Sequence, residues 1–353
     1  MKESQNNNGK KRLRRAWLQW SNLLAAASGL AVVGLAAKRF RRPRDIRWLD
    51  HTHILHHAMA SNFRVVDGVR IHYQEKIDDP KRRATAETMV LLHGFCSSNY
   101  TWKDCMLPLA TAGYRVIAPD LKGFGFSEKP ADQRYDITDQ AKLIIGLLDS
   151  LGVEQATFIG NSYGGAVSMA CALRNPDRVK QLVLVDAVHN NGALGRRPIY
   201  VRMMRTRGVA EVFGPLLFGS PRLVRHYLSN MYHDKTVVTE ERYHAYHRPL
   251  RAASCQAAAI TTMRQWEASW LEQELSAIAV PTLIIWGEYD WALPVEWGAE
   301  LHLAMPNSQF IVIPNCGHLP QEERPEETCA FILDFCAMSS PATVGGQVWQ
   351  IER

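Results

Sequence analysis

A serine flanked by glycines follows a short apolar run and precedes a segment that can form a helix, and this arrangement constrains the fold more than any other feature. The apolar run is residues 156–159, the sequence GNSYG occupies residues 160–164, and residues 166–173 suit a helix. Glycines two residues either side of the serine avoid the steric clashes of a sharp strand-to-helix turn. Such a turn exposes the hydroxyl group, so we expect Ser162 to be a nucleophile.

Apolar runs that suit strands alternate with segments that suit helices from residue 63 onward. Most of the runs are continuously apolar, which is typical of parallel strands buried on both faces. We therefore predict an α/β fold, with an eight-stranded, mostly parallel sheet and helices on both faces. The expected strands are residues 63–66, 69–74, 89–92, 115–118, 156–159, 181–185, 282–286 and 309–313, and the expected helices lie near 102–112, 137–151, 163 onward and 325–336.

This alternation stops between Asp186 and Pro281, over a stretch too long for an ordinary connection. Its amphipathic segments predict a helical cap inserted over the carboxyl edge of the sheet, the edge at which the parallel strands end. The cap segments are 200–204, 209–218, 221–231 and 240–275. The predicted domains are a basic N-terminal segment at 1–44, a linker at 45–62, an α/β core at 63–186 and 282–338, a cap at 187–281 and a tail at 339–353.

A histidine and an acid follow the last two expected strands, where loops can bring them to the serine. His318 can accept the serine proton and return it to a leaving group. Asp290 can orient the imidazole and stabilise its cation. Glu288 is a nearby alternative acid, and Asp186 after the sixth strand is the stronger alternative. The expected catalytic residues are Ser162, His318 and Asp290.

Acyl transfer also develops a negative charge on oxygen, which backbone N–H groups can stabilise. Two N–H groups are candidates for this oxyanion hole. One belongs to Tyr163, directly after the serine, and the other to Phe95, in the loop after the third strand.

With these motifs, the chain resembles the α/β-hydrolase fold superfamily, in the capped branch of epoxide hydrolases, haloalkane dehalogenases, meta-cleavage-product hydrolases and monoacylglycerol-lipase-like enzymes. The resemblance covers residues 63–338. The epoxide hydrolases and dehalogenases carry aspartate where this chain has Ser162, so the resemblance disfavours those two activities. The matching motifs, in the order the superfamily uses, are HGF at 93–95, PDLKGFGFS at 119–127, GNSYGG at 160–165, Asp290 and GH at 317–318.

This resemblance implies a serine hydrolase that cleaves a carboxylic ester through an acyl-enzyme, with a lipid-like substrate as one option. Carbon–carbon bond hydrolases, perhydrolases and acyltransferases use the same three residues and stay open as alternatives. A ligand-binding module with an idle triad is the non-enzymatic alternative.

The basic residues of the chain are concentrated near its start. Residues 1–44 hold eleven of the 41 Lys and Arg against Glu3 alone, so the other residues carry 30 basic and 34 acidic side chains. The folded part is therefore not expected to bind nucleic acid. Between the basic clusters, residues 16–37 are 22 positions without a charge, about 33 Å as a helix.

That uncharged segment predicts a single-pass N-terminal membrane anchor and a membrane localisation. Trp17 and Trp20 suit the interface, whereas basic residues on both flanks leave the orientation open. A cleaved signal peptide, a soluble amphipathic helix, and a twin-arginine export signal at Arg14 and Arg15 are alternatives.

No cofactor or metal is expected. The seven cysteines include no C-x-x-C pair, so neither a zinc site nor a disulfide framework is indicated. The expected partners are a small-molecule ester substrate and, through the N-terminal helix, the membrane. The oligomeric state stays open.

Overall fold

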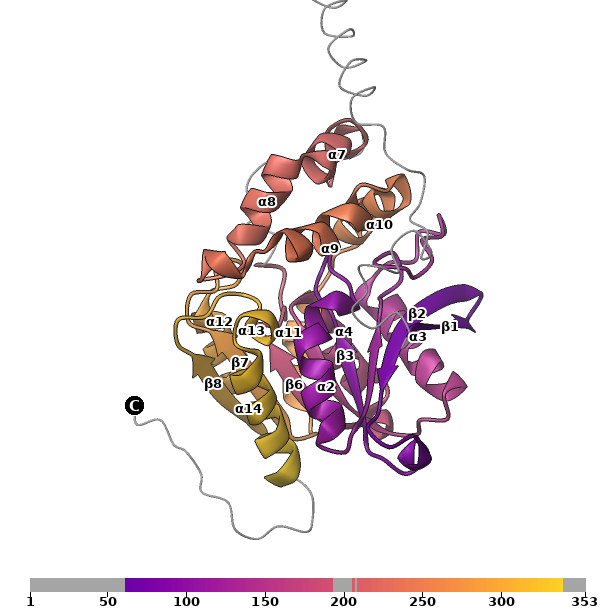
Figure 1. Ribbon diagram of the computed structural model, residues 1–353, viewed down its shortest axis with the longest axis vertical. Helices are drawn as coiled ribbons and strands as arrows, with labels where there is room; N and C mark the ends of the chain where they lie inside the picture. Colours follow the sequence, from indigo (N-terminus) through magenta and orange to yellow (C-terminus); the bar gives the residue numbers. More distant parts are fainter. Residues whose placement is uncertain (1–60, 193–204, 207, 339–353) are drawn as a thin grey trace, which may run out of the picture. The chain divides into compact units, whose positions relative to one another are not determined.

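A computed structural model describes residues 61–192, 205–206 and 208–338 of the chain. In these residues eight strands form one sheet, in the order β1-β2-β4-β3-β5-β6-β7-β8 (Figure 1). All eight expected strands are present, so the predicted α/β fold is confirmed. The strands are β1 (Ser61–Val66), β2 (Val69–Lys76), β3 (Thr88–Leu92), β4 (Arg115–Pro119), β5 (Ala156–Asn161), β6 (Val179–Val185), β7 (Thr282–Gly287) and β8 (Ser308–Ile313).

The sheet is antiparallel at one end and parallel elsewhere. β1 and β2 form a hairpin that turns at Asp67 and Gly68, which both have positive φ angles. β2 is also antiparallel to β4, whereas β4, β3, β5, β6, β7 and β8 are mutually parallel neighbours. The strands β3, β4, β5 and β7 are buried along their whole length, as expected for strands covered on both faces.

Helices cover both faces of the sheet, and alternate residues of each strand point to opposite helical layers. Met89 and Leu91 of β3 pack with side chains of α2 and α14. Val90 and Leu92 of the same strand belong to a separate hydrophobic cluster on the other face, with side chains of α3 and α4. The helices outside the cap are α2 (Lys103–Thr111), α3 (Ile137–Ser150), α4 (Tyr163–Arg174), α12 (Val295–Ala304), α13 (Pro320–Glu323) and α14 (Pro325–Met338), with 3-10 turns η3 (Pro80–Arg82), η4 (Asn99–Trp102) and η5 (Pro176–Arg178).

The cap is helical, as predicted, and Figure 1 shows α7 to α10 grouped beyond one end of the sheet. The expected helix at 200–204 lies outside the described residues. The expected long segment at 240–275 is three helices, because the chain turns near Pro249 and again after Arg264. The domain boundaries stay a prediction. The described cap elements are α7 (Val209–Gly219), α8 (Pro221–Ser229), η6 (Lys235–Val237), α9 (Glu240–Leu250), α10 (Ala253–Arg264), α11 (Ser269–Glu274) and η7 (Leu275–Ala277).

The predicted transmembrane helix and membrane localisation are contradicted. None of the helices in residues 61–192, 205–206 and 208–338 is both long and apolar enough to span a bilayer. The longest of these, α3 and α14, have 14 residues each, or about 21 Å of helix against about 30 Å of hydrocarbon. The expected span, 16–37, lies outside the described residues, and its alanine-rich composition is only modestly apolar. The membrane is therefore not retained as a partner.

We expect Gly164→Ala to destabilise the fold by about 3 kcal/mol or more, through overpacking against the backbone. The added Cβ would lie 2.3 Å from the carbonyl oxygen of Leu92 and 2.7 Å from that of His93. Gly152→Ala is the control, because Gly152 has a φ of 66° but no atom within 4 Å of the added Cβ. Its expected loss is about 1–2 kcal/mol, from backbone strain alone. Urea denaturation compares the two variants, and equal losses would contradict the expectation.

Candidate active site

Ser162 lies at the turn between β5 and α4. Its φ of 53° and ψ of −115° are unfavourable for a residue with a side chain. Gly160 and Gly164 allow the turn, because a Cβ on Gly160 would lie 2.3 Å from the Gly164 carbonyl oxygen. The Ser162 N–H donates to the carbonyl of Val185 at 3.0 Å, and its carbonyl accepts from the N–H of Val188 at 3.1 Å. The residues around the end of β6 therefore hold the strained serine in place.

His318 lies in the loop after β8, and its side chain is buried. Its N–H donates to the carbonyl of Met231 in the cap at 2.7 Å. Its carbonyl accepts from the side-chain amide of Asn161 at 3.1 Å, and the same amide donates to the carbonyl of Val185 at 3.1 Å. Because Asn161 directly precedes Ser162, its side chain joins the serine turn to the histidine loop.

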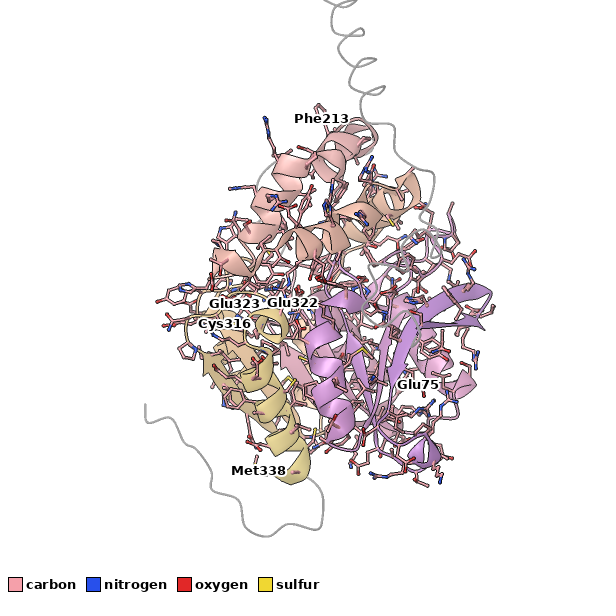
Figure 2. The ribbon with its side chains drawn as sticks, in the orientation of Figure 1. Glu75, Phe213, Cys316, Glu322, Glu323 and Met338 are labelled. Atoms are coloured by element: carbon pink, nitrogen blue, oxygen red, sulfur yellow. The ribbon has the colours of Figure 1, made fainter. Side chains whose placement is uncertain are left out.

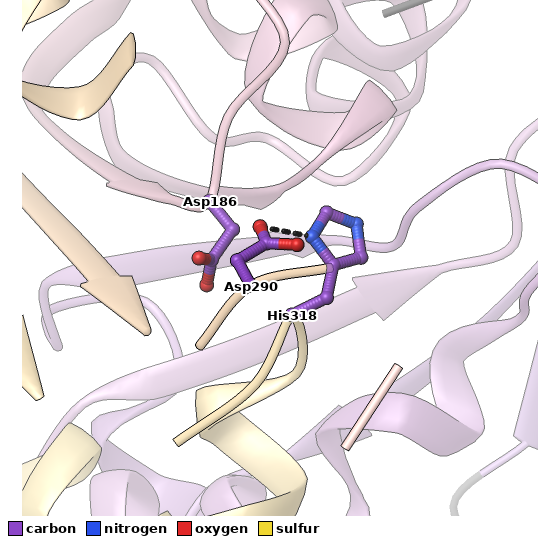
Figure 3. Close-up of side chains that lie close together, drawn as sticks. All are labelled: Asp186, Asp290 and His318. Carbon is purple, nitrogen blue, oxygen red and sulfur yellow. Dashed lines mark hydrogen bonds and ion pairs between the residues drawn. The ribbon is translucent and has the colours of Figure 1, made fainter. Parts of the chain in front are cut away.

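A short hydrogen bond joins His318 to Asp290, with Nδ1 donating to Oδ2 at 2.6 Å (Figure 3). Asp290 Oδ1 accepts from the N–H groups of Ala292 at 2.6 Å and Leu293 at 2.9 Å. Three donors therefore surround a carboxylate whose side chain is fully buried. Since Nδ1 donates to Asp290, Nε2 is the ring nitrogen left to accept a proton.

The loops that carry Asp290 and His318 touch each other through glycines. A Cβ on Gly287 would lie 1.9 Å from the carbonyl oxygen of Gly317, and one on Gly317 would lie 2.5 Å from the carbonyl oxygen of Met231. No side chain fits at either position. Backbone contact therefore sets how closely the acid loop, the histidine loop and the cap approach.

Neither of the two alternative acids is hydrogen-bonded to the ring of His318. Glu288 is exposed and accepts from the N–H of Asn315 at 3.0 Å. Asp186 is buried at the end of β6, and its Oδ1 accepts from the N–H of Gly287 at 2.9 Å. The histidine ring nitrogen bonds Asp290 and not Asp186. We propose Asp290 as the acid that orients the base.

The Phe95 loop lies against the serine, since a Cβ on Gly94 would lie 3.3 Å from the Cβ of Ser162. Tyr163 is the first residue of α4, where backbone N–H groups lack acceptors within the helix. We propose the N–H groups of Phe95 and Tyr163 as the donors to a developing oxyanion.

His93 supports this loop, a role that the sequence did not predict. Its Nδ1 donates to the carbonyl of Gly94 at 2.8 Å, and its Nε2 accepts from the N–H of Leu121 at 2.9 Å. Burial lowers the pKa of His93 below its usual range, which favours this neutral tautomer. The sequence feature that could have indicated this role is the position of His93, between an apolar strand and Gly94.

One group of side chains among the described residues has the spacing of a metal site. Its possible ligand atoms lie within 4.8 Å of one another and belong to Asp186, Asp290 and His318. Several of these atoms already have hydrogen-bond partners, however. His318 Nδ1 donates to Asp290, and Asp186 Oδ1 accepts from the N–H of Gly287. The hydrogen bonds of Asp290, His318 and Asp186 already account for these positions, so we interpret the cluster as a hydrogen-bonded acid–histidine group.

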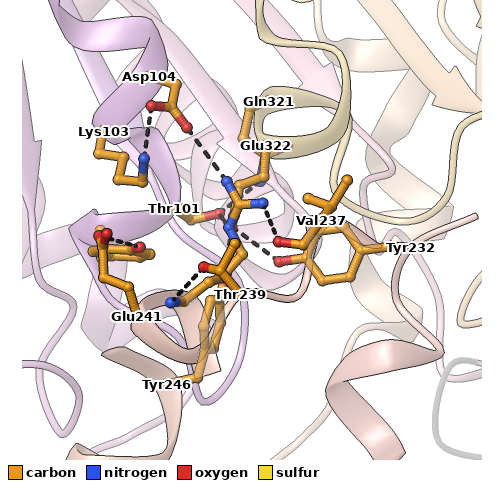
Figure 4. Close-up of polar contacts among 12 residues, drawn as sticks. Thr101, Lys103, Asp104, Tyr232, Val237, Thr239, Glu241, Tyr246, Gln321 and Glu322 are labelled. Carbon is orange, nitrogen blue, oxygen red and sulfur yellow. Dashed lines mark hydrogen bonds and ion pairs between the residues drawn. The ribbon is translucent and has the colours of Figure 1, made fainter. Parts of the chain in front are cut away.

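Glu322 of α13 forms polar contacts with both the cap and the core (Figure 4). Its buried carboxylate accepts from the hydroxyls of Thr101 at 2.6 Å, Tyr232 at 2.9 Å and Tyr246. It also forms an ion pair with Nε of Arg242 at 2.8 Å. Burial raises the pKa of Glu322, and the opposing effect of Arg242 offsets this only in part. Since Arg242 and Tyr246 lie on α9, one carboxylate joins the cap to α13 and η4.

The next residue connects the cap to the histidine loop. Figure 2 shows Glu322 and Glu323 between the cap helices and the core. Glu323 accepts from the N–H groups of Gly317 at 2.8 Å, His233 at 3.1 Å and Asp234 at 2.6 Å. Gly317 precedes His318, so the cap loop and the histidine loop share one carboxylate.

Residues 87–325 match the family model described as alpha/beta hydrolase fold. The chain is 34% identical over 276 residues to an uncharacterized hydrolase, YugF, of Bacillus subtilis (strain 168), covering 76% of this chain and 95% of the relative. It is 36% identical over 232 residues to a 2-hydroxymuconate semialdehyde hydrolase of Pseudomonas putida, covering 63% and 77%. The structure of a membrane phospholipase A, a bacterial virulence factor, is similar at 26% identity and a TM-score of 0.69, covering 93% of this chain and all of that one.

The chain therefore belongs to the alpha/beta hydrolase fold family. Its similarity to named hydrolases identifies it as a hydrolytic enzyme.

We expect Asp290→Asn to slow fluorophosphonate labelling of the protein about 10³- to 10⁴-fold, because the amide favours the wrong imidazole tautomer and cannot stabilise the imidazolium. Glu288→Gln is the matched control, since this exposed acid lies two residues away. Its labelling rate should equal that of the wild type. Equal rates in both variants would contradict the assignment of Asp290.

We expect Glu322→Gln to lower the free energy of unfolding by about 3 kcal/mol, because it removes the nearest counter-charge of the buried Arg242. The remaining acid, Asp104, lies 3.4 Å from Arg242 and is only partly buried. Glu327→Gln, on the exposed side of α14, is the control. Urea denaturation measures both, and a loss no larger than that of the control would show that Glu322 does not stabilise the cap contact.

Proposed function

We propose that this enzyme cleaves a bond at a carbonyl carbon through an acyl-enzyme on Ser162, and that the bond is the carbon–carbon bond of a hydroxy-oxo-dienoate. The observation that carries the reaction class is the buried hydrogen bond between Asp290 and His318, because a serine nucleophile needs a base oriented in this way. The substrate class is supported by relatives with such names, among them a 2-hydroxy-6-oxo-2,4-heptadienoate hydrolase at 30% identity.

In the first step Nε2 of His318 takes the hydroxyl proton of Ser162 while Oγ bonds to the ketone carbon. The carbonyl oxygen becomes an oxyanion that accepts from the N–H groups of Phe95 and Tyr163. Asp290 stabilises the imidazolium that results. Its three hydrogen bonds are already formed, so the carboxylate needs no rearrangement during the reaction.

For the second step the substrate is in its keto form, in which the enol proton has moved to the carbon beside the ketone. The carbon–carbon bond then breaks, and its electron pair passes into a conjugated dienolate. The imidazolium of His318 returns its proton to the dienolate oxygen, which releases the hydroxy-dienoate and leaves an ester on Ser162. Water then attacks the ester carbon, with His318 again as base, and releases a carboxylic acid. One water is consumed, and the serine regains its proton.

A carboxylic ester is the second candidate substrate. The similarity to the phospholipase structure covers 93% of this chain and favours it. The buried lysines and arginines of the described residues also each have a carboxylate partner, so none of them offers an unpaired charge to a substrate carboxylate. These pairs are Arg115 with Glu75, Lys122 with Asp132, and Arg242 with Glu322. An ester without a carboxylate requires no such cation.

We expect the purified protein to consume 2-hydroxy-6-oxo-2,4-heptadienoate, measured by the loss of its dienolate absorbance. Ser162→Ala should reduce the rate by at least about 10³-fold, because the nucleophile is removed. Ser168→Ala is the control, since that hydroxyl only donates to the carbonyl of Gly164 at 2.9 Å within α4.

A parallel assay with p-nitrophenyl esters of short and long acyl chains separates the two substrates. Ester hydrolysis without turnover of the dienoate would contradict the carbon–carbon proposal and support the second candidate. Unchanged rates in Ser162→Ala would contradict both.

A further inference from the structure

Two buried carboxyl groups meet at the carboxyl edge of the sheet, and the proposed mechanism uses only one of them. Asp186 follows β6 and Asp290 follows β7, and Figure 3 shows both beside His318. Ligand atoms of the three side chains lie within 4.8 Å of one another. The N–H of Asp186 donates to the carbonyl of Ile285 at 2.9 Å, and its φ of 44° is positive, so a constrained backbone holds its carboxyl group in place.

The hydrogen bonds of the two carboxyl groups differ. Asp290 accepts from two backbone N–H groups and from His318, which is the environment of a charged carboxylate. Asp186 accepts from the N–H of Gly287 alone, and its Oδ2 is buried without a donor among the described residues. Burying a second, poorly solvated charge beside the first is strongly unfavourable.

We propose that Asp186 is a neutral carboxylic acid that donates a hydrogen bond to Asp290 and thereby positions the Asp290–His318 pair. The proton lies on Oδ2 of Asp186, the oxygen that accepts no hydrogen bond. Its single hydrogen bond to Asp290 gives Oδ2 a partner and gives Asp290 a fourth one. Asp186 is a positioning residue that does not touch the substrate. Its effect on catalysis rests on the proposed function, whereas its protonation does not.

The surroundings of Asp186 agree with this assignment. Burial and, next, the charge of Asp290 raise the pKa of Asp186 well above its usual range. Glu323 acts in the same direction. Burial and, next, the charge of Asp186 raise the pKa of Cys316, so this thiol adds no charge at neutral pH. A neutral Asp186 leaves one carboxylate to stabilise the imidazolium of His318.

The protonation state is tested through stability in the full chain, with Asp186→Asn. A folded state that holds a proton lost on unfolding becomes less stable as pH rises above the unfolded pKa. Between about pH 5 and about pH 7, the unfolded-to-folded ratio of the wild type should therefore rise by up to about tenfold more per pH unit than that of the variant. Urea denaturation at each pH gives both curves, and parallel curves would overturn the proposal.

The positioning role is tested by the rate of fluorophosphonate labelling and its dependence on pH. Asp186→Asn keeps a hydrogen-bond donor toward Asp290. It should therefore be labelled at the wild-type rate, and this rate should fall at the same low pH as in the wild type. Asp186→Leu removes the donor and should label about 10- to 100-fold more slowly. If the labelling rate of Asp186→Asn fell only at a lower pH than that of the wild type, the substitution would have removed a negative charge near His318, and the proposal would be overturned. A slower labelling rate in the folded Asp186→Asn variant would overturn it as well.

The stability test is independent of catalysis. If wild-type protein took up no label at all, the proposed function would fail, whereas the pH dependence of unfolding would still decide whether Asp186 is protonated. Thermal unfolding of each variant excludes misfolding as the cause of a slow rate.

Discussion

The parallel register of β5, β6, β7 and β8 is the constraint on which the candidate site depends. Asn161 pairs with Val185, Val185 with Ile285, and Gly287 with Ile313, so the four strands end at one edge. The residues that leave each strand are therefore brought together, although they are far apart in sequence. They include the strained serine, the two acids and the histidine.

Close backbone contacts at this edge connect the site to the cap. Gly317 touches both the acid loop and the cap at Met231, and Glu323 holds the N–H groups of the histidine loop and of the cap loop together. Glu322, one residue earlier, is buried between α9 and η4. A shift of the cap relative to the core would break these bonds, so the position of His318 depends on the docked cap.

Local patterns predicted the sheet and the positions of the candidate residues. Most of the strands contain a continuous apolar run. Ser162 directly follows β5, whereas Asp290 and His318 lie in the loops after β7 and β8. Contacts between distant residues were not predictable in this way. Glu322 reads as a surface acid in the sequence, yet its bond to Thr101 spans 221 positions, and the sequence gives no sign that this acid is buried.

The boundaries of the cap helices and the choice between the two acids could not be predicted from the sequence. The cap segment at 240–275 has helical character throughout, but tertiary packing divides it into α9, α10 and α11. Helix α12, between Asp290 and β8, was not predicted. The choice between Asp186 and Asp290 depended on which loop reaches the imidazole, and only the three-dimensional arrangement provides that information.

The central claim, that Ser162 is activated by His318, is tested most directly by mapping the site of modification after fluorophosphonate treatment of the folded protein. Mass spectrometry of the digested protein should find a single phosphonyl adduct, on the peptide that contains Ser162 and on that residue. An adduct on a different residue, or a folded protein that remains unmodified, would contradict the account.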